Sequence, residues 1–378
     1  LSTLLFLLGS AWAGCCSSMN ALIAARVLQG IGGGGITPLG QVILAQNHDL
    51  ASRAKLQSAL VAVWGIASIG GPPLGGYLVS FASWRWIFFL NLPFGLLGML
   101  AVALYLPSMP SALRRAFDGL GFTLFLIAYS CLLAACESLR GSTVQLSAVT
   151  WTLTAVLLAL LWRYESRQSD PFFPIHLRQH PVFARTFWLA PLIGVGAFGG
   201  ISYLPLYFQG VLGQSASESG HSMLPFLLAW SGSASFAARL FLRKGPRFCV
   251  VIACVAITLG FLGLCFIPTD PWLLFFCECG VGIGGGLSFS PLMLSVQAEV
   301  PAAVLGTATS AVVFLRMVGA SLGTSLMGIF LPAHSETLAA SSVLGPALQK
   351  AFILGEVCAA AALVLSLTLP NEAPPKDV

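Results

Sequence analysis

The sequence predicts an all-α integral membrane protein whose chain crosses the bilayer about twelve times. Of its 378 residues, 57% are hydrophobic and only 8% are charged, whereas about a quarter of the residues of a soluble domain are charged. The apolar residues also gather in runs of about twenty, the length that a helix needs to cross the hydrocarbon core. The net charge of +5 arises at the ends of these runs. It therefore does not indicate nucleic-acid binding.

Six apolar runs precede the polar stretch 163–185, and six follow it. The first six cover residues 1–17, 20–46, 56–81, 86–106, 118–139 and 149–162. The second six cover residues 187–208, 222–242, 248–267, 272–297, 303–331 and 351–369. Each run is expected to form one transmembrane helix, and no run of soluble-domain composition separates them.

Basic residues at the ends of the runs predict the orientation of the chain. Lys and Arg concentrate on alternate loops, among them those that hold Arg53, Arg114 and Arg163. The opposite loops hold few basic residues, such as Arg85 and Arg140. Because cytoplasmic loops carry the excess of Lys and Arg, the C-terminus is expected in the cytoplasm.

The stretch 65–76 is unusually rich in glycine and proline for a transmembrane helix. Its sequence is Gly65-Ile-Ala-Ser-Ile-Gly-Gly71-Pro72-Pro-Leu-Gly75-Gly76. Small residues let two helix backbones pack closely in lipid, and neighbouring helices can cover a proline kink. Each glycine taken singly is explained by close helix packing without any chemical role. The combined spacing of the glycines and prolines is a more specific signal than any one of them.

An internal repeat relates the two halves of the chain. Gly71-Pro-Pro-Leu-Gly75 matches Gly319-Ala-Ser-Leu-Gly323, and Gly30-Ile-Gly-Gly-Gly34 matches Gly282-Ile-Gly-Gly-Gly286. Both pairs are separated by about 250 residues, which indicates duplicated halves of a transporter.

Several segments resemble motifs of one family, the major facilitator superfamily. Residues 26–30, Arg-Val-Leu-Gln-Gly, are similar to its fourth-helix motif, and residues 65–76 resemble the antiporter motif of its fifth helix. Residues 84–93 resemble the sixth helix, 117–121 the start of an extra seventh helix and 314–319 the thirteenth. The chain thus resembles the fourteen-helix drug:proton antiporter branch, of the fungal type, without the first two helices of that branch.

The resemblance implies a division into three parts. These are a truncated N-terminal helical bundle (1–107), two linking transmembrane helices with a cytoplasmic loop (108–185) and a C-terminal six-helix bundle (186–378). Matched halves of the repeat would need two further helices before Leu1. We therefore expect upstream coding sequence to contain two apolar spans, and we expect the 378-residue chain alone not to transport.

By resemblance, the protein is a proton-coupled secondary transporter in the plasma membrane. It would export small organic compounds, such as a drug, a toxin or a secondary metabolite, by alternating access. Its partners would be the substrate, protons and the lipid bilayer, with no nucleic acid, no cofactor and no metal, and we expect a monomer. Multidrug resistance by efflux would be the cellular consequence.

Four polar side chains within the runs are candidates for proton coupling or for a substrate cavity: Arg26, Gln29, Glu278 and Arg316. An arginine in a transmembrane helix is costly and usually faces a cavity or a partner. Arg26 would help to relay the proton, and Gln29, three residues on, shares its face. Arg26 alternatively anchors its helix near the outer surface, and Arg316 alternatively forms a structural salt bridge to Glu278 or Glu299.

The glycines and the proline of the two motifs are assigned to helix packing and the antiporter motif: Gly30, Gly65, Gly71, Pro72, Gly75 and Gly76. Asp118 marks a helix start, where a carboxylate complements the helix dipole.

Three other functions stay open. One is an uptake carrier of the same fold, for a sugar or an iron chelate, and another is a non-transporting remnant. The third is a membrane-bound enzyme, against which the sequence shows neither a histidine cluster nor a nucleophile–base pair. It also lacks the phosphate-binding loop of an ATPase.

Overall fold

A computed structural model describes residues 1–105, 118–139, 144–168, 175–332 and 341–370. Every regular element in these residues is helical, so the predicted all-α fold is confirmed for them. The chain forms two compact units, which we call unit 1 and unit 2. Unit 1 comprises Leu1–Leu44 and Gly70–Ala116, and unit 2 comprises Ala45–Ile69 and Phe117–Val378.

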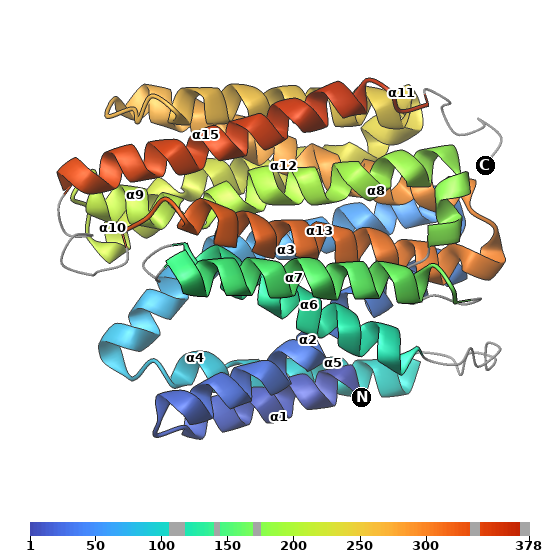
Figure 1. Cartoon of the computed structure of the whole chain (residues 1–378), viewed down its shortest axis with the longest axis horizontal. Helices are drawn as coiled ribbons and strands as arrows, with labels where there is room; N and C mark the ends of the chain where they lie inside the picture. Colours follow the sequence, from blue (N-terminus) through green and yellow to red (C-terminus); the bar gives the residue numbers. More distant parts are fainter. Residues whose placement is uncertain (106–117, 140–143, 169–174, 333–340, 371–378) are drawn as a thin grey trace. The chain divides into compact units, whose positions relative to one another are not determined.

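Unit 1 is built from the first five helices of the chain. They are α1 (Ser2–Cys15), most of α2 (Met19–Asn47), the end of α3 (Leu50–Phe81) from Gly70 onward, α4 (Trp86–Phe89) and α5 (Asn91–Tyr105). Helix α1 packs against α4 and α5 (Figure 1). The chain crosses from unit 1 into unit 2 near the end of α2 and returns within α3.

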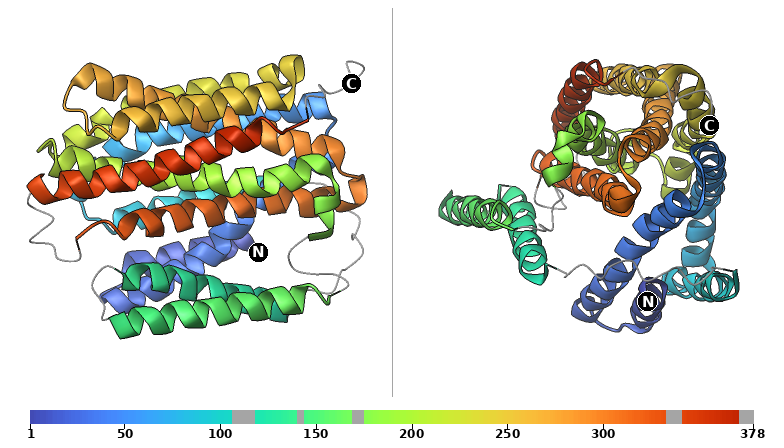
Figure 2. Two further views of the ribbon diagram at one scale, coloured as in Figure 1. Left: turned by 45° about the horizontal axis from the view of Figure 1, so that its top comes forward. Right: turned by 90° about the vertical axis from the view of Figure 1, so that its right-hand side faces the viewer.

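Unit 2 contains the remaining helices. They are α6 (Gly119–Ser138), α7 (Val144–Glu165), η1 (Ile175–Gln179), α8 (Pro181–Ile193), the π-helix η2 (Gly194–Gly199), α9 (Leu204–Gly210), α10 (Ala216–Ser222), α11 (Leu224–Leu264), α12 (Pro271–Glu299), η3 (Ala302–Val304), α13 (Leu305–Gly328) and α15 (Ser341–Ser366). Helix α12 packs mainly on α11, whereas α13 packs on α8 and η2. The end-on view in Figure 2 shows these long helices running roughly along one direction.

Nine helical stretches of the described chain are long and apolar enough to cross a membrane. Helix α1, with 14 residues, is shorter. One of the nine, Glu218–Leu264, contains two of the predicted spans, 222–242 and 248–267. The helices thus follow the predicted apolar runs.

Helix α11 is a hairpin of two helical segments. Gly245 interrupts it with a φ of 81° and a ψ of 173°, a conformation that glycine adopts without steric cost. A Cβ built on Gly282 would lie 3.1 Å from the Trp230 nitrogen, and one on Gly284 would lie 2.9 Å from the Ile257 nitrogen. Trp230 and Ile257 would be about 40 Å apart in a straight helix. Both arms of α11 therefore flank the same turn of α12.

The internal repeat is preserved in the packing of the glycine-rich helices. In unit 1, a Cβ on Gly32 would lie 2.7 Å from the Phe6 Cα of α1. Its repeat counterpart Gly284 approaches the backbone of Ile257 in the second arm of α11 equally closely. Small residues at such contacts let helix backbones touch. The two halves thus use one packing scheme, as the duplication predicts.

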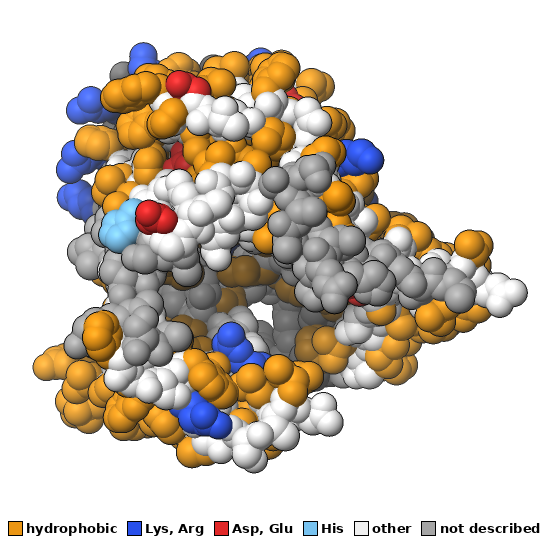
Figure 3. All heavy atoms as spheres, turned by 90° about the vertical axis from the view of Figure 1, so that its left-hand side faces the viewer, with side chains coloured by type: hydrophobic (Ala, Val, Ile, Leu, Met, Phe, Trp, Pro, Cys, Tyr) orange, Lys and Arg blue, Asp and Glu red, His pale blue; other side chains and the backbone are white. Residues whose placement is uncertain are grey.

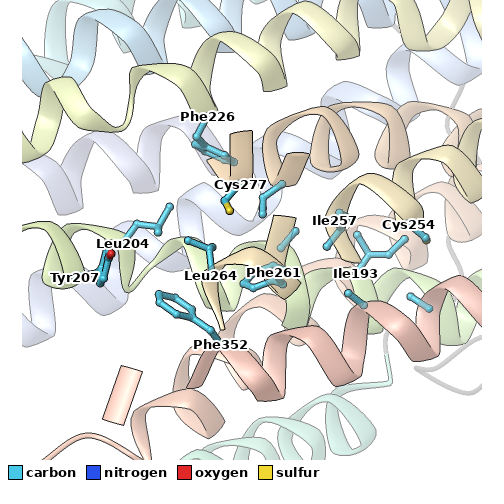
Figure 4. Packing of buried hydrophobic residues seen from close by; sticks show 14 of the residues in the cluster. Ile193, Leu204, Tyr207, Phe226, Cys254, Ile257, Phe261, Leu264, Cys277 and Phe352 are labelled. Carbon is cyan, nitrogen blue, oxygen red and sulfur yellow. The ribbon is translucent and has the colours of Figure 1, made fainter. Parts of the chain in front are cut away.

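The largest buried core lies in unit 2, where aromatic rings from three helices meet (Figure 4). The Phe352 ring of α15 lies 6.2 Å from the Tyr207 ring of α9 and 6.4 Å from the Phe261 ring of α11, measured between centroids. All three side chains are fully buried. These contacts tie α15 to the α9 and α11 segments.

Large apolar side chains also cover the outside of the helices. Helix α5 has no buried residue at all, and Leu104, Trp272 and Phe276 are each more than 60% exposed. Figure 3 shows hydrophobic side chains over much of one face. Such exposure suits helices whose solvent is lipid.

Two predicted helix starts are too late in the chain. Helix α8 begins at Pro181 rather than at residue 187, and α15 begins at Ser341 rather than at 351. Proline fits the first turn of a helix because its missing N–H has no partner there. Pro181 is therefore a start signal, and Pro346, near the start of α15, does not break that helix.

Glycine packing in unit 1 gives a direct test of the fold. We expect Gly32→Leu to destabilise the protein by about 1–3 kcal/mol, because the side chain would overlap the α1 backbone. Gly34→Leu should be nearly neutral, since no described atom outside its own helix lies within 4 Å of a Cβ at that position. Thermal unfolding of the two variants in the same detergent measures the difference. Equal midpoints would contradict the packing.

Candidate transport sites

A buried serine of α1 joins this helix to three others of unit 1, α2, α4 and α5. Ser10 of α1 is 0% exposed, and its hydroxyl donates to the Phe88 carbonyl oxygen at 2.9 Å. The Ser10 hydroxyl oxygen also accepts hydrogen bonds from the Gln29 Nε2 of α2 and from the Asn91 Nδ2 of α5, each at 3.0 Å. A hydroxyl has one donor and two acceptor positions. Ser10 therefore uses all of them.

Arg26 extends this network toward the surface of unit 1. Its Nη1 donates to the Gln29 Oε1 at 2.9 Å, and its Cζ lies 5.1 Å from the centroid of the Phe88 ring. Gln29 is 6% exposed and accepts from Arg26 while it donates to Ser10. The predicted shared face of Arg26 and Gln29 is present. We call the four polar residues Ser10, Arg26, Gln29 and Asn91 the Ser10 network.

The local sequence explains how α1 approaches α2 at this point. Gly9 precedes Ser10, and a Cβ on Gly9 would lie 2.7 Å from the Gln29 Cα. Only glycine permits that approach, which brings the Ser10 hydroxyl to the Gln29 amide. Ser10 and Asn91 escaped the sequence analysis, although each is a polar residue within an apolar run, which is a signal of a helix-to-helix hydrogen bond.

Arg316 lies between aromatic rings in unit 2. Its Cζ is 4.2 Å from the centroid of the Phe289 ring of α12 and 5.0 Å from that of Phe198 in η2. Its Nε is buried and has no hydrogen-bond partner among the described residues. Aromatic faces attract cations, but they do not accept the in-plane N–H groups of a guanidinium.

The carboxylates named as alternative partners of Arg316 are placed elsewhere. Glu299 accepts hydrogen bonds from the Val182 and Phe183 backbone N–H groups at 3.0–3.2 Å and so caps the start of α8. Glu278 is 1% exposed, and its Oε2 has no hydrogen-bond partner in the described chain. The structure therefore does not form the salt bridge that was weighed for Arg316.

The repeat relates Glu278 to Arg26. Gly30 matches Gly282 in the repeat, so the residue four positions before each glycine, Arg26 or Glu278, is also equivalent. An intramembrane cation in one half thus corresponds to an intramembrane carboxylate in the other.

In the described residues, no group of three or more His, Cys, Asp or Glu side chains is placed to hold a metal ion.

The residues of the antiporter motif differ in their surroundings. Gly65 is buried, and a Cβ there would overlap the Ser231 side chain of α11. Among the described residues outside its own helix, no atom lies within 4 Å of a Cβ built on Gly71, Gly75 or Gly30. Close helix packing is therefore present at Gly65 and stays a prediction for the others. The surroundings of Pro72 and Gly76 lie outside what the structure describes.

Asp118 has the predicted helix-start role. It caps α6, where its Oδ1 accepts from the Gly121 N–H at 2.8 Å. The Tyr164 hydroxyl of α7 donates to the same oxygen at 2.9 Å, which links the two helices.

Curated relatives of this chain are bacterial transport proteins. The multidrug transporter protein MdtP of Bacillus subtilis is 31% identical over 348 residues, which are 89% of this chain and 63% of MdtP. The putative multidrug resistance protein MdtD of Serratia proteamaculans is 29% identical over 96% of this chain and 76% of its own length. The uncharacterised transporter Rv1877 of Mycobacterium tuberculosis is 31% identical, but the chain spans only 48% of its length. The chain thus spans less than two thirds of MdtP and of Rv1877.

Solved structures share the fold. The human organic anion transporter MFSD10 gives a TM-score of 0.60 at 17% identity, covering 94% of this chain and 76% of that one. The proton:xylose symporter XylE gives 0.60 at 14% identity, covering 95% and 77%. A model of the Major Facilitator Superfamily matches residues 1–324. The chain therefore belongs to the major facilitator superfamily, a family of membrane transporters and not of enzymes.

Proposed function

We propose that this protein is a proton-coupled secondary transporter that exports small organic compounds by alternating access. The observation that carries the proposal is Arg26, an intramembrane arginine held by the buried Gln29 amide. The names of the relatives MdtP and MdtD support a multidrug substrate range. Intramembrane ionisable residues typically mark ion and substrate pathways.

Proton coupling needs a carboxyl group whose charge depends on the proton. A deprotonated carboxylate would pair with Arg26, and protonation would release it. Among the described residues, no ion pair involves Arg26, and Gln29 is its hydrogen-bond partner. Glu278, with a buried oxygen that lacks a partner, is the carboxyl group that we assign to proton carriage.

The two linking helices support membership of the fourteen-helix branch. Helices α6 and α7 pack on each other, and the Tyr129 hydroxyl of α6 donates to the Val318 carbonyl oxygen of α13 at 2.8 Å. The Phe125 and Phe314 rings lie 5.1 Å apart at the same contact. We propose parts 1–107, 108–185 and 186–378, with the linking pair docked on the last. The relatives named above are bacterial, and a fungal origin stays a prediction.

The proposal also includes topology and assembly. The basic loops, including those with Arg163 and Arg239, support a cytoplasmic C-terminus. We propose the plasma membrane as the location. We propose a monomer as the transporting unit. Export rather than uptake follows from the antiporter motif around Gly71 and is tested by the direction of transport.

Replacement of Arg26 tests the proton pathway. We expect Arg26→Ala, made in a version of the protein that transports, to abolish proton-gradient-driven export. Arg26→Lys should retain part of it because the charge survives without the planar fork. Export of a fluorescent drug from cells, normalised to membrane expression, is the measurement. Arg85→Ala is the matched control, since Arg85 also lies over a ring, that of Trp84, but outside the apolar run. Unchanged export by Arg26→Ala would refute the role.

The Ser10 network gives a second test. We expect Ser10→Ala to destabilise the protein by about 1–3 kcal/mol, because buried donors on Gln29 and Asn91 lose their acceptor. Ser10→Ala and Gln29→Ala should be coupled by roughly 0.5 kcal/mol or more in a double-mutant cycle of unfolding free energy. Ser17→Ala, at an exposed position between α1 and α2, is the control. Strict additivity of the two buried changes would show that the hydrogen bond does not stabilise the fold.

A further inference from the structure

Arg316 is a partly buried cation, with a fully buried Nε, at the centre of a transmembrane helix. It is the twelfth of the 24 residues of α13, so it lies near the middle of the span. A guanidinium remains protonated in proteins and cannot escape its charge by releasing a proton. A charge at that depth normally faces a cavity, an ion pathway or a partner.

The structure supplies only part of what this cation needs. The Phe289 and Phe198 rings attract the guanidinium at 4.2 Å and 5.0 Å, yet its buried Nε–H has no hydrogen-bond acceptor in the described chain. Glu299 is occupied at the start of α8, where it accepts from two backbone N–H groups. A buried donor without an acceptor is costly. An acceptor from outside the protein would remove that cost.

Backbone packing fixes the position of Arg316. A Cβ on Gly194 would lie 2.6 Å from the Arg316 carbonyl oxygen, and one on Gly319 would lie 2.8 Å from the Pro191 carbonyl carbon. These contacts hold α13 against α8 and η2. Single π-helical turns often occur at functional sites, and η2 carries Phe198. The cation and one of its rings are thus held in place before any ligand binds.

We propose that Arg316 binds the anionic group, a carboxylate, of the compound that this protein transports. The guanidinium edge offers parallel N–H donors that match the two oxygens of a carboxylate. The Phe198 ring lies 5.1 Å from the Trp230 ring, so aromatic surface continues away from the cation and would contact an aromatic body. The substrate class is therefore aromatic carboxylates. This inference rests on the proposed transport function and specifies its substrate.

Equilibrium binding to a matched ligand series tests this directly. The probes are 1-naphthaleneacetate, the neutral 1-naphthaleneacetamide and the cationic 1-naphthylethylamine, which share one ring system. The purified protein is held in phosphatidylcholine nanodiscs without a pH gradient. We expect the carboxylate to bind at least tenfold more tightly than the amide. Arg316→Gln should remove that preference, with amide binding changed less than twofold, and Arg316→Lys should retain part of it.

Arg178→Gln is the matched control variant. Arg178 also lies over a phenylalanine ring, that of Phe187, at 5.4 Å, but in the short η1 helix. It should keep the carboxylate preference. Retained amide binding shows that Arg316→Gln is folded. If Arg316→Gln loses amide binding as well, the ratio of carboxylate to amide affinity in Arg316→Lys decides, because that variant should retain part of the preference. A carboxylate preference below twofold in the wild type overturns the proposal.

Two further outcomes would also overturn it. Tighter binding of the amine than of the carboxylate would assign the site to cations. Competition from phosphatidylglycerol in the nanodiscs, present in the wild type and absent in Arg316→Gln, would assign Arg316 to lipid headgroups. Because no pH gradient is applied, a failure of proton coupling would leave these binding results unaffected. Conversely, export of only neutral or cationic compounds would contradict this inference and leave the proposed transport function intact.

Discussion

Lipid offers transmembrane helices no hydrophobic drive to associate, so they must fit closely and satisfy their polar groups among themselves. Glycine provides the close fit in this protein. In unit 1, Gly9 and Gly32 bring α1 onto α2, and in unit 2 Gly284 brings α12 onto α11. Each contact is between backbones, where a side chain would collide. The placement of the functional side chains depends on these contacts.

The two intramembrane arginines show how such contacts lead to different surroundings. Gly9 sets α1 close enough for Ser10 to hold the Gln29 amide, and Gln29 then holds Arg26. Gly194 and Gly319 instead seal α13 against α8 and η2, which leaves Arg316 among aromatic rings with its Nε unpartnered in the described residues. One arginine is hydrogen-bonded within the protein, and the other retains a donor for a ligand. We therefore assign Arg26 to coupling and Arg316 to substrate binding.

Much of this architecture could be predicted from the sequence, because bilayer thickness and helix geometry limit what an apolar run can form. The internal repeat is evident in the sequence, and the structure contains it as equivalent helix contacts of Gly32 and Gly284. The contact of Arg26 with Gln29 follows from three-residue spacing on a helix. Ser10 and Asn91 were missed because their partners depend on the mutual placement of α1, α2 and α5. That placement is not local to any run.

The salt bridge weighed for Arg316 fails for a similar reason. Charge complementarity in a sequence does not show which N–H groups compete for a carboxylate, and the start of α8 takes Glu299. Likewise, Gly71 and Gly75 match Gly319 and Gly323 in sequence. Among the described residues, however, a neighbouring backbone lies close to the second pair and not to the first.

The central claim is that substrate export is coupled to proton entry, and proton movement tests it most directly. The protein would be reconstituted into proteoliposomes that contain a pH-sensitive dye and are preloaded with substrate. If the account is right, outward substrate flux should acidify the lumen, and Arg26→Ala should abolish this signal. Substrate flux at the normal rate with no change in lumenal pH would contradict the account.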